Sequence, residues 1–400
     1  MHKKQLIAAV VGGMLAPAAF AQITISGTIK DGLEMYKLGA GNAGAAAASS
    51  YHYEPRVSDQ SSRIIFSGTQ DLGGGTRAWF QLDSRFQSDV GGSTQNANGS
   101  VTTGINLWAG GNTGVGLAGD WGKLTIGRWD LHYLEFIPIE FGYAGSLQDL
   151  LGAGPMAQVN GTNTGTSTSA STIANGTRTP NVIMWDSANM GGFTARVAYS
   201  TAFATNLTGV SSNEGSGKGA SGSSGGAVTA AVRYAGGPLA LGASAWSARP
   251  ESATSSPAGQ QKSVRVWGGY TLPMGLKVGL GFDNSQRRQA AGEDMTKRNA
   301  FMVPVSYNFG SHTAYFTVAK VGKLSGPNAG SPTDSTDAIA YGVGWEYALS
   351  KLATVGAFYA KIDNKANANY NFFSLSANGA TAATAGESAA QLYAGFSYRF

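Results

Sequence analysis

The sequence contains no cysteine and is poor in charge. Without cysteine, the chain can neither form a disulfide nor carry a lipid on an N-terminal cysteine. Lys, Arg, Asp and Glu make up only 13% of the 400 residues, against about 25% in an average soluble domain. Beyond the N-terminus there is also no uncharged apolar run of about 18 residues, which a membrane helix would need. The remaining way for such a chain to cross a bilayer is a closed β-barrel, whose alternating strands contain no long apolar run.

The N-terminus has the three parts of a secretory signal. His2-Lys3-Lys4 is basic, Leu6–Phe20 is apolar but too short to span a bilayer, and Ala19-Phe20-Ala21 has the pattern of a cleavage site. We therefore expect residues 1–21 to be a signal peptide and residues 22–400 to form one barrel. Cleavage would remove two of the 28 basic residues, leaving 26 against 23 acidic ones, an excess too small to indicate a nucleic-acid partner.

Apolar and polar residues alternate with a period of two in several segments, as in a strand with one face toward lipid. The last ten residues show it best, with Leu392, Ala394, Phe396, Tyr398 and Phe400 on one face and Gln391, Tyr393, Gly395, Ser397 and Arg399 on the other. A terminal Phe with aromatics two and four residues before it is similar to the signal read by the outer-membrane insertion machinery. Residues 76–86 and 337–347 alternate in the same way. In the second of these, Gly and Ala on the inner face predict an open lumen.

Turn residues divide the chain into hairpins. Short turns are expected at residues 71–74, 119–120, 189–191, 236–238, 273–275, 310–311 and 349–350. Longer polar loops are expected near residues 37–56, 87–103, 130–179, 201–226, 249–261, 284–298, 323–336 and 363–388. Seven turns and eight loops make fifteen connections, so the sequence predicts an all-β, transmembrane antiparallel barrel of sixteen strands.

The segment Ser62–Gly75, with the sequence SRIIFSGTQDLGGG, resembles an early strand and turn of the general, trimeric porins of β-proteobacteria, the neisserial and Comamonas-type family. Further similar segments are Ala78–Ser84, Val115–Gly122, Leu124–Arg128 and Tyr393–Phe400. In patches, the resemblance covers almost the whole chain after residue 21.

The resemblance implies a homotrimer of sixteen-stranded barrels in the Gram-negative outer membrane, surrounded by lipid and lipopolysaccharide. Each barrel would be a general diffusion channel for ions and small hydrophilic solutes, with no cofactor and no catalytic activity. The third loop, Asp130–Thr179, would fold inward as a constriction, and its acids Glu135, Glu140 and Asp149 would face basic residues of the barrel wall. Motif matching carries this wall role to Arg63 and Arg178, with Asp83 in place of the family's Glu. Before the Val-Gly-Leu stretch, where the family often has an arginine, this chain has Gly111-Asn112-Thr113-Gly114.

Strand parity supports some of these positions independently. Arg63 lies on the face opposite Ile64 and Phe66, so it points inward if the segment is a strand. Arg77, Asp83 and Arg85 share the inward face of their strand. Because the arginines outnumber the acid on these wall segments, we expect a mild preference for anions.

Other functions remain open. A substrate-specific channel would need an aromatic slide or a dense ladder of one charge, and the inward-facing Trp79 and Trp267 lie far apart in the sequence. A barrel hydrolase would need a catalytic histidine, and His132 with Asp130 is the one pair that merits a test. An adhesin would act through its loops. No motif for a metal or cofactor site is present.

Overall fold

A computed structural model describes most of the predicted barrel. The described residues are 22–39, 54–60, 62–89, 109–132, 135–136, 138–139, 179–201, 226–249, 260–288, 296–326, 334–370 and 385–400. The predicted signal peptide, residues 1–21, lies outside them. Among the described residues, none belongs to a helix long and apolar enough to cross a membrane.

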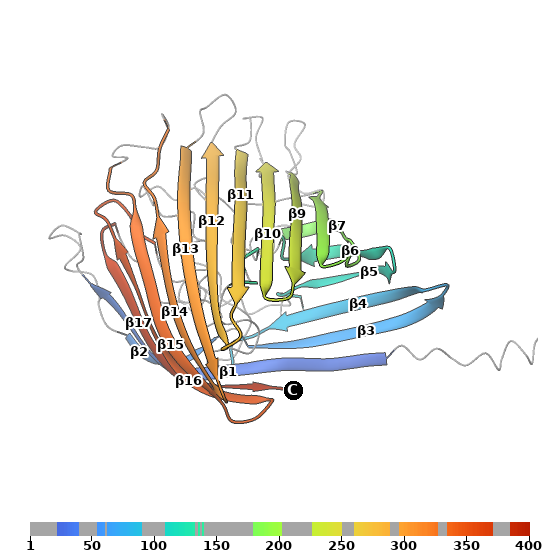
Figure 1. The fold of residues 1–400 in the computed structure, drawn as a ribbon, viewed down its shortest axis with the longest axis horizontal. Helices are drawn as coiled ribbons and strands as arrows, with labels where there is room; N and C mark the ends of the chain where they lie inside the picture. Colours follow the sequence, from blue (N-terminus) through green and yellow to red (C-terminus); the bar gives the residue numbers. More distant parts are fainter. Residues whose placement is uncertain are drawn as a thin grey trace, which may run out of the picture.

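The described elements are all β-strands. They are β1(Gln22–Gly39), β2(Glu54–Asp59), β3(Arg63–Gly73), β4(Thr76–Arg85), β5(Thr113–Gly119), β6(Gly122–Trp129), β7(Thr179–Asp186), β8(Phe193–Ser200), β9(Gly226–Gly236), β10(Leu239–Arg249), β11(Gln260–Thr271), β12(Leu276–Arg288), β13(Thr296–Phe309), β14(His312–Val321), β15(Ala338–Ala348), β16(Ala353–Asn364) and β17(Ser388–Arg399). Each strand from β3 onward pairs antiparallel with the next along the chain. The sheet closes because β17 also pairs with β1, from Thr28↔Arg399 to Gly39↔Ser388. Figure 1 shows the sheet curling round until the red C-terminal strands reach blue β1.

The barrel has sixteen strands, as predicted, because β2 and β3 are two halves of one strand. Both pair with β1, β3 along Gln22–Thr28 and β2 along Asp31–Tyr36. The interruption between them, which the sequence analysis did not anticipate, is a bulge held by side chains. The Lys30 N–H donates to Ser62 Oγ at 3.0 Å, and its carbonyl accepts from the Gln60 N–H at 2.9 Å. The hydroxyl therefore replaces a missing ladder bond.

The two faces of the strands differ as the alternation predicted. In β17, Leu392, Phe396 and Tyr398 are exposed on the outside, whereas Gln391 and Tyr393 are buried on the inside. In the other strands too, the outer rows are rich in exposed apolar side chains, the pattern of a sheet facing lipid. The inner rows carry polar and charged groups, which face the lumen, contact loop residues or bind one another.

The seven short turns lie where they were predicted, and most strands begin and end within a few residues of the expected positions. At the first turn, Gly73, Gly74 and Gly75 all have positive φ, which side chains rarely tolerate. One boundary was wrong. The loop predicted for residues 87–103 extends further, because β5 begins only at Thr113. Residues 109–112 instead lie against the inner side of β4, as described below.

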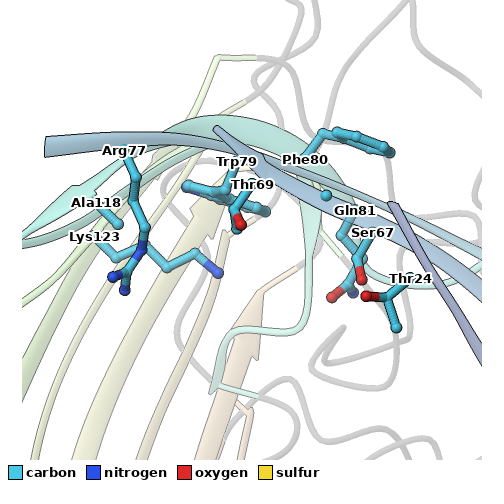
Figure 2. A pocket seen from close by; sticks show the side chains of 10 residues that line it. Thr24, Ser67, Thr69, Arg77, Trp79, Phe80, Gln81, Ala118 and Lys123 are labelled. Carbon is cyan, nitrogen blue, oxygen red and sulfur yellow. The ribbon is translucent and has the colours of Figure 1, made fainter. Parts of the chain in front are cut away.

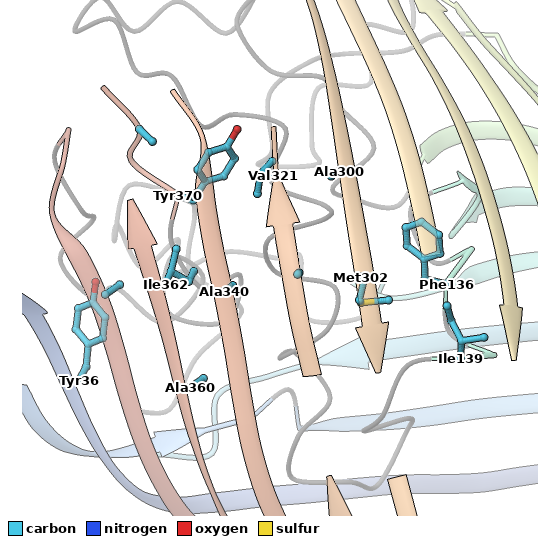
Figure 3. Packing of buried hydrophobic residues seen from close by; sticks show 14 of the residues in the cluster. Tyr36, Phe136, Ile139, Ala300, Met302, Val321, Ala340, Ala360, Ile362 and Tyr370 are labelled. Carbon is cyan, nitrogen blue, oxygen red and sulfur yellow. The ribbon is translucent and has the colours of Figure 1, made fainter. Parts of the chain in front are cut away.

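The expectation that small inner residues leave the lumen open was wrong for β15. Ala338 and Ala340 are buried in an apolar cluster inside the barrel. Side chains from connecting segments, Phe136, Ile139 and Tyr370, belong to the same cluster, and Figure 3 shows several of its members across the wall formed by β11 to β17. Small wall residues therefore make room for chain that folds inward.

Candidate pore lining

The third loop enters the barrel directly after β6. The backbone of Asp130 is held on both sides, because its N–H donates to Asn112 Oδ1 at 2.8 Å and its carbonyl accepts from Arg196 Nη1 at 3.1 Å. Leu131 belongs to a buried cluster with residues of β7 to β10, and the described residues 132, 135–136 and 138–139 contact the inner faces of β9 to β13. The expected inward fold of the third loop is therefore confirmed for its described part.

His132 is the first anchor of this loop. Its Nδ1 lies 2.5 Å from Ser244 Oγ in β10, and its Nε2 lies 2.8 Å from Ser263 Oγ in β11. The ring is 1% exposed and stacks on Trp246 with 6.5 Å between ring centroids. Burial, reinforced by the nearby Arg265 charge, holds the pKa of His132 well below its usual value.

The hydrogen bonds also fix the tautomer of this neutral imidazole. Ser263 Oγ donates to Asp283 Oδ2 at 2.9 Å, so its one proton is already used. Ser263 must then accept from His132 Nε2–H, and Ser244 donates to Nδ1. The histidine thus links the loop to β10 and β11 through one hydrogen bond to each strand.

Close to His132, the carboxylate of Asp283 in β12 pairs with two buried arginines. Arg265 Nε donates to its Oδ2 at 2.8 Å, and Arg298 Nη2 lies 3.6 Å from its Oδ1. All three side chains are at most 1% exposed. Arg265 also donates to the His132 carbonyl at 3.1 Å and lies 4.9 Å above the Phe136 ring. Buried charges are tolerated when they are paired in this way.

Glu135 is the second anchor. Its carboxylate receives two hydrogen bonds from Arg233 in β9, at 2.9 and 2.7 Å, and a third from Trp267 Nε1 at 3.3 Å. The glutamate is 1% exposed. The predicted loop acid is thus inside the barrel and paired with a wall arginine, although that arginine was not one of the predicted ones.

Inner-face glycines receive the apolar residues of the loop. A Cβ at Gly281 would lie 3.0 Å from the Phe136 ring, and one at Gly269 would lie 2.8 Å from Ile139 Cγ2. The loop therefore packs directly on the strand backbone at these positions. Lys277 completes the docking by donating to the Pro138 carbonyl.

The predicted wall residues lie on the inner face of β3 and β4. Arg63 and Arg85 are direct register partners. Arg85 binds the carboxylate of Asp83 with two hydrogen bonds, at 2.9 and 3.0 Å, and Asp83 is 1% exposed. Arg63 is half-buried and forms no ion pair within the described part of the chain.

The missing arginine near Gly111 now has a structural explanation. A Cβ at Gly111 would lie 2.0 Å from Asp83 Cγ, and the Asn112 N–H donates to Asp83 Oδ2 at 3.3 Å. This backbone occupies the space beside Asp83, so a larger side chain does not fit at Gly111.

Of the four remaining predicted residues, one lies in the described part of the barrel and three do not. Arg77 is exposed on the inner face of β4 and lines a cavity near the tight turns. Arg178, Glu140 and Asp149 lie outside the described residues. The role of all eight predicted residues at a constriction stays a prediction.

Sequence reasoning missed the side chains that hold the loop. Parity could have placed Arg265 inward, because it shares a face with Trp267, and the same argument applies to Asp283. Their partners could not have been found, since Arg265 and His132 are 133 residues apart in the chain. The pairing of His132 with Asp130 is not seen, because both ring nitrogens contact serines instead. No group of residues suited to a metal ion occurs among the described residues.

Comparisons with known proteins agree with this fold. Major outer membrane protein P.IB of Neisseria meningitidis serogroup B is 33% identical over 126 residues, which cover 32% of this chain and 33% of the relative. The chain therefore matches about a third of the length of these curated relatives. An anion-selective porin from Comamonas acidovorans has a similar fold, with a TM-score of 0.68 at 20% identity, covering 95% of this chain and all of that one. OmpT of Vibrio cholerae gives a TM-score of 0.62 at 13% identity, covering 96% of this chain and 99% of that one.

The family assignment depends on a family model whose match is longer than the 126 residues matched by the P.IB relative. The family model described as Gram-negative porin matches residues 7–367. Together with the outer membrane relatives and the barrel fold, this match assigns the protein to the outer membrane. The chain belongs to the Gram-negative porin family.

Proposed function

We propose that the protein is a general diffusion porin, a water-filled channel for ions and small hydrophilic solutes. The observation that carries this proposal is a closed barrel with apolar outer rows, charged inner rows and a loop held inside it by buried contacts. A loop fixed in this way narrows the lumen without needing a ligand to hold it. The proposal includes no catalytic step, since His132 is enclosed by the serines, Trp246 and Arg265, with no space for a substrate.

A mild anion preference follows from the charges that remain available to solutes. The carboxylates of Asp83 and Glu135 are already neutralised by Arg85 and Arg233. Arg63 and Arg77, on the same inner face, form no ion pair within the described residues. Guanidinium groups stay charged at any working pH and lower the barrier for anions. The structural likeness to an anion-selective porin agrees with this direction.

Reconstitution into planar bilayers tests the channel proposal. A general diffusion channel should give discrete conductance steps that rise in proportion to KCl concentration, without saturation. A substrate-specific channel would instead saturate with its solute, and an adhesin or hydrolase would give no steps. Absence of steps from folded, reconstituted protein would contradict the proposal.

We also propose that the chain assembles as a homotrimer through the region around β1, with lipid and lipopolysaccharide covering the remaining outer surface. Asp31 lies on an outward row of β1, opposite exposed Phe396 in β17 and between the exposed Ile29 and Leu33. The Asp31 carboxylate accepts a hydrogen bond from Ser88 Oγ at 2.9 Å and lies opposite Asp59, so this part of the outer surface is polar and suits a protein neighbour better than hydrocarbon. Light scattering in mild detergent should give three protomers, and Asp31→Arg should lower that number. A monomeric wild type would contradict the proposal.

A further inference from the structure

A cavity of about 340 Å³ opens on the inner wall at the end of the barrel where the tight turns lie. Its lining comes from β1, β3, β4, β5 and β6. Figure 2 shows Arg77, Trp79 and Lys123 projecting to one side of the sheet, away from Phe80. The position is separate from the contacts that the described residues 132, 135–136 and 138–139 of the third loop make with β9 to β13.

Two cations from different strands line this cavity. Arg77 in β4 is the register partner of Ala118 in β5, and Ala118 is the partner of Lys123 in β6. The three residues thus form one row across neighbouring strands, which lie about 4.8 Å apart. The middle residue, Ala118, is 5% exposed, and its small side chain lets Lys123 reach across β5 to the Trp79 ring in β4.

Each acid beside this row accepts hydrogen bonds from a group other than Arg77 or Lys123. Asp71, the register partner of Arg77, accepts the Gly73 N–H of its own turn at 2.8 Å. Asp186, the partner of Lys123, is held by two hydrogen bonds from Arg196, at 2.6 and 3.1 Å. Within the described chain, neither Arg77 nor Lys123 forms an ion pair.

Lys123 is held in place by aromatic rings. Its Nζ lies 3.5 Å from the centre of the Trp79 ring and 5.1 Å from that of Trp129. Trp79 is itself fixed, since its Nε1–H donates to the Leu124 carbonyl at 3.1 Å. Cation–π contacts restrict the ammonium without neutralising it, so less conformational entropy is lost when an anion binds.

Hydroxyl groups supply further donors. Thr24 from β1 and Ser67 and Thr69 from β3 line the same cavity. Two cations from different strands together with hydroxyls suit an anion that carries two charges and several oxygens. The volume exceeds that of a bare tetrahedral ion and leaves room for a small substituent.

We propose that this cavity is a binding site for a phosphate dianion, free or carried by a small ester, between Arg77 and Lys123. The proposal rests on the proposed channel function, because solutes reach the site through the lumen. Phosphate bound there would transiently occupy the end of the pore and reduce the current of chloride.

The test is chloride conductance in planar bilayers at constant ionic strength, titrated with potassium phosphate, with glycerol phosphate, or with potassium acetate. Wild-type conductance should fall saturably with phosphate and not with acetate. Inhibition by glycerol phosphate as well would assign the site to phosphate esters, and inhibition by inorganic phosphate alone would assign it to the free ion. Arg77→Gln and Lys123→Gln should each raise the half-saturating concentration about tenfold or more, since each removes a charged donor.

Two further variants separate binding from general charge. Ala118→Leu adds bulk to the cavity lining without changing charge and should also abolish saturable inhibition. Lys351→Gln removes a charge from the turn between β15 and β16, at the same end of the barrel but outside the cavity, and should leave inhibition unchanged. Conducting wild-type channels without saturable inhibition would overturn this site alone, whereas a complete lack of channels would overturn the channel function too. Equal inhibition in wild type and both Gln variants would also overturn the site.

Discussion

On the wall formed by β9 to β13, Arg265, Asp283 and Arg298 are buried and bound to one another or to the third loop. On the wall formed by β3 to β6, Arg63, Arg77 and Lys123 form no ion pair within the described residues, and Arg77 is exposed. Both walls are rich in arginine, so the amount of charge does not distinguish them. The difference lies in what each charge contacts.

This comparison separates two uses of inward charge in one barrel. A paired and buried charge fixes the position of the loop and is screened from solutes by its partner. A charge without a carboxylate partner keeps its field in the lumen and acts on passing ions. We therefore expect substitutions on the first wall to change stability and loop position, and substitutions on the second to change selectivity.

The largest effect should come from Asp283→Ala. Removing this carboxylate leaves Arg265 and Arg298 buried without their shared partner, which costs about 3–5 kcal/mol. The free energy of unfolding in liposomes, measured by urea titration, should fall by that amount. The control is Asp363→Ala, which breaks an ion pair with Lys361 that is about one-third exposed and should cost about 0–1 kcal/mol. Equal losses of unfolding free energy in the two variants would show that the buried ion pairs of Asp283 stabilise the protein no more than a partly exposed pair does.

Loop docking can be disturbed by one of two adjacent glycines on opposite faces of β11. Gly269→Val should push Ile139 away from the wall, with an overpacking cost of about 1–3 kcal/mol. Gly268→Val faces outward, where the nearest contact is the flexible end of Leu241, and serves as the control. Limited proteolysis should cut the third loop faster in Gly269→Val only. Similar rates in both variants would mean that residues 138–139 do not hold the loop.

Acid should loosen the loop through His132. Its docked pKa lies below the ordinary value of about 6.5, so between these two values an undocked loop binds a proton that a docked loop does not. Docking is thus strongest above pH 6.5 and weakens as pH falls, by about 1.4 kcal/mol for each unit of pKa depression. The facing groups are Ser244, Ser263, Trp246, Arg265 and, through Ser263, Asp283.

The measurement is proteolysis of the third loop as a function of pH. The wild type should become more sensitive below pH 6.5, and His132→Gln, which cannot take up a proton, should lose that dependence. A parallel pH profile in the two proteins would assign the change to other groups.

The sequence predicts the barrel well because strand parity and turn residues are local. Leu392 and Gln391 show the two faces from ten residues alone, and the glycines at 73–75 define a turn by themselves. The contacts inside the barrel are not local. Glu135 could be assigned to the loop but not to Arg233, 98 residues away, and His132 fell in the loop with no signal of its two serine partners.

The bulge in the second strand was missed for a related reason. Ser62 looks like an ordinary strand residue, and only pairing with Lys30 gives its hydroxyl a backbone role. Similarly, the sequence alone shows only that Gly111 stands where a cation is expected. In the structure the Gly111 backbone lies so close to Asp83 that a side chain at this position would clash with the carboxylate.

The smallest effect tests the central claim most directly, namely that the charges without partners on the β3–β6 wall set selectivity. The measurement is the reversal potential under a KCl gradient for wild type, Arg63→Ala and the control Lys351→Ala. The account predicts a mild anion preference in wild type, because at about 0.1 M salt the Debye length of roughly 10 Å leaves the charges only partly screened. Arg63→Ala should shift the potential toward cations by a few millivolts, while Lys351→Ala should not. Cation preference in the wild type, or no shift on losing Arg63, would contradict it.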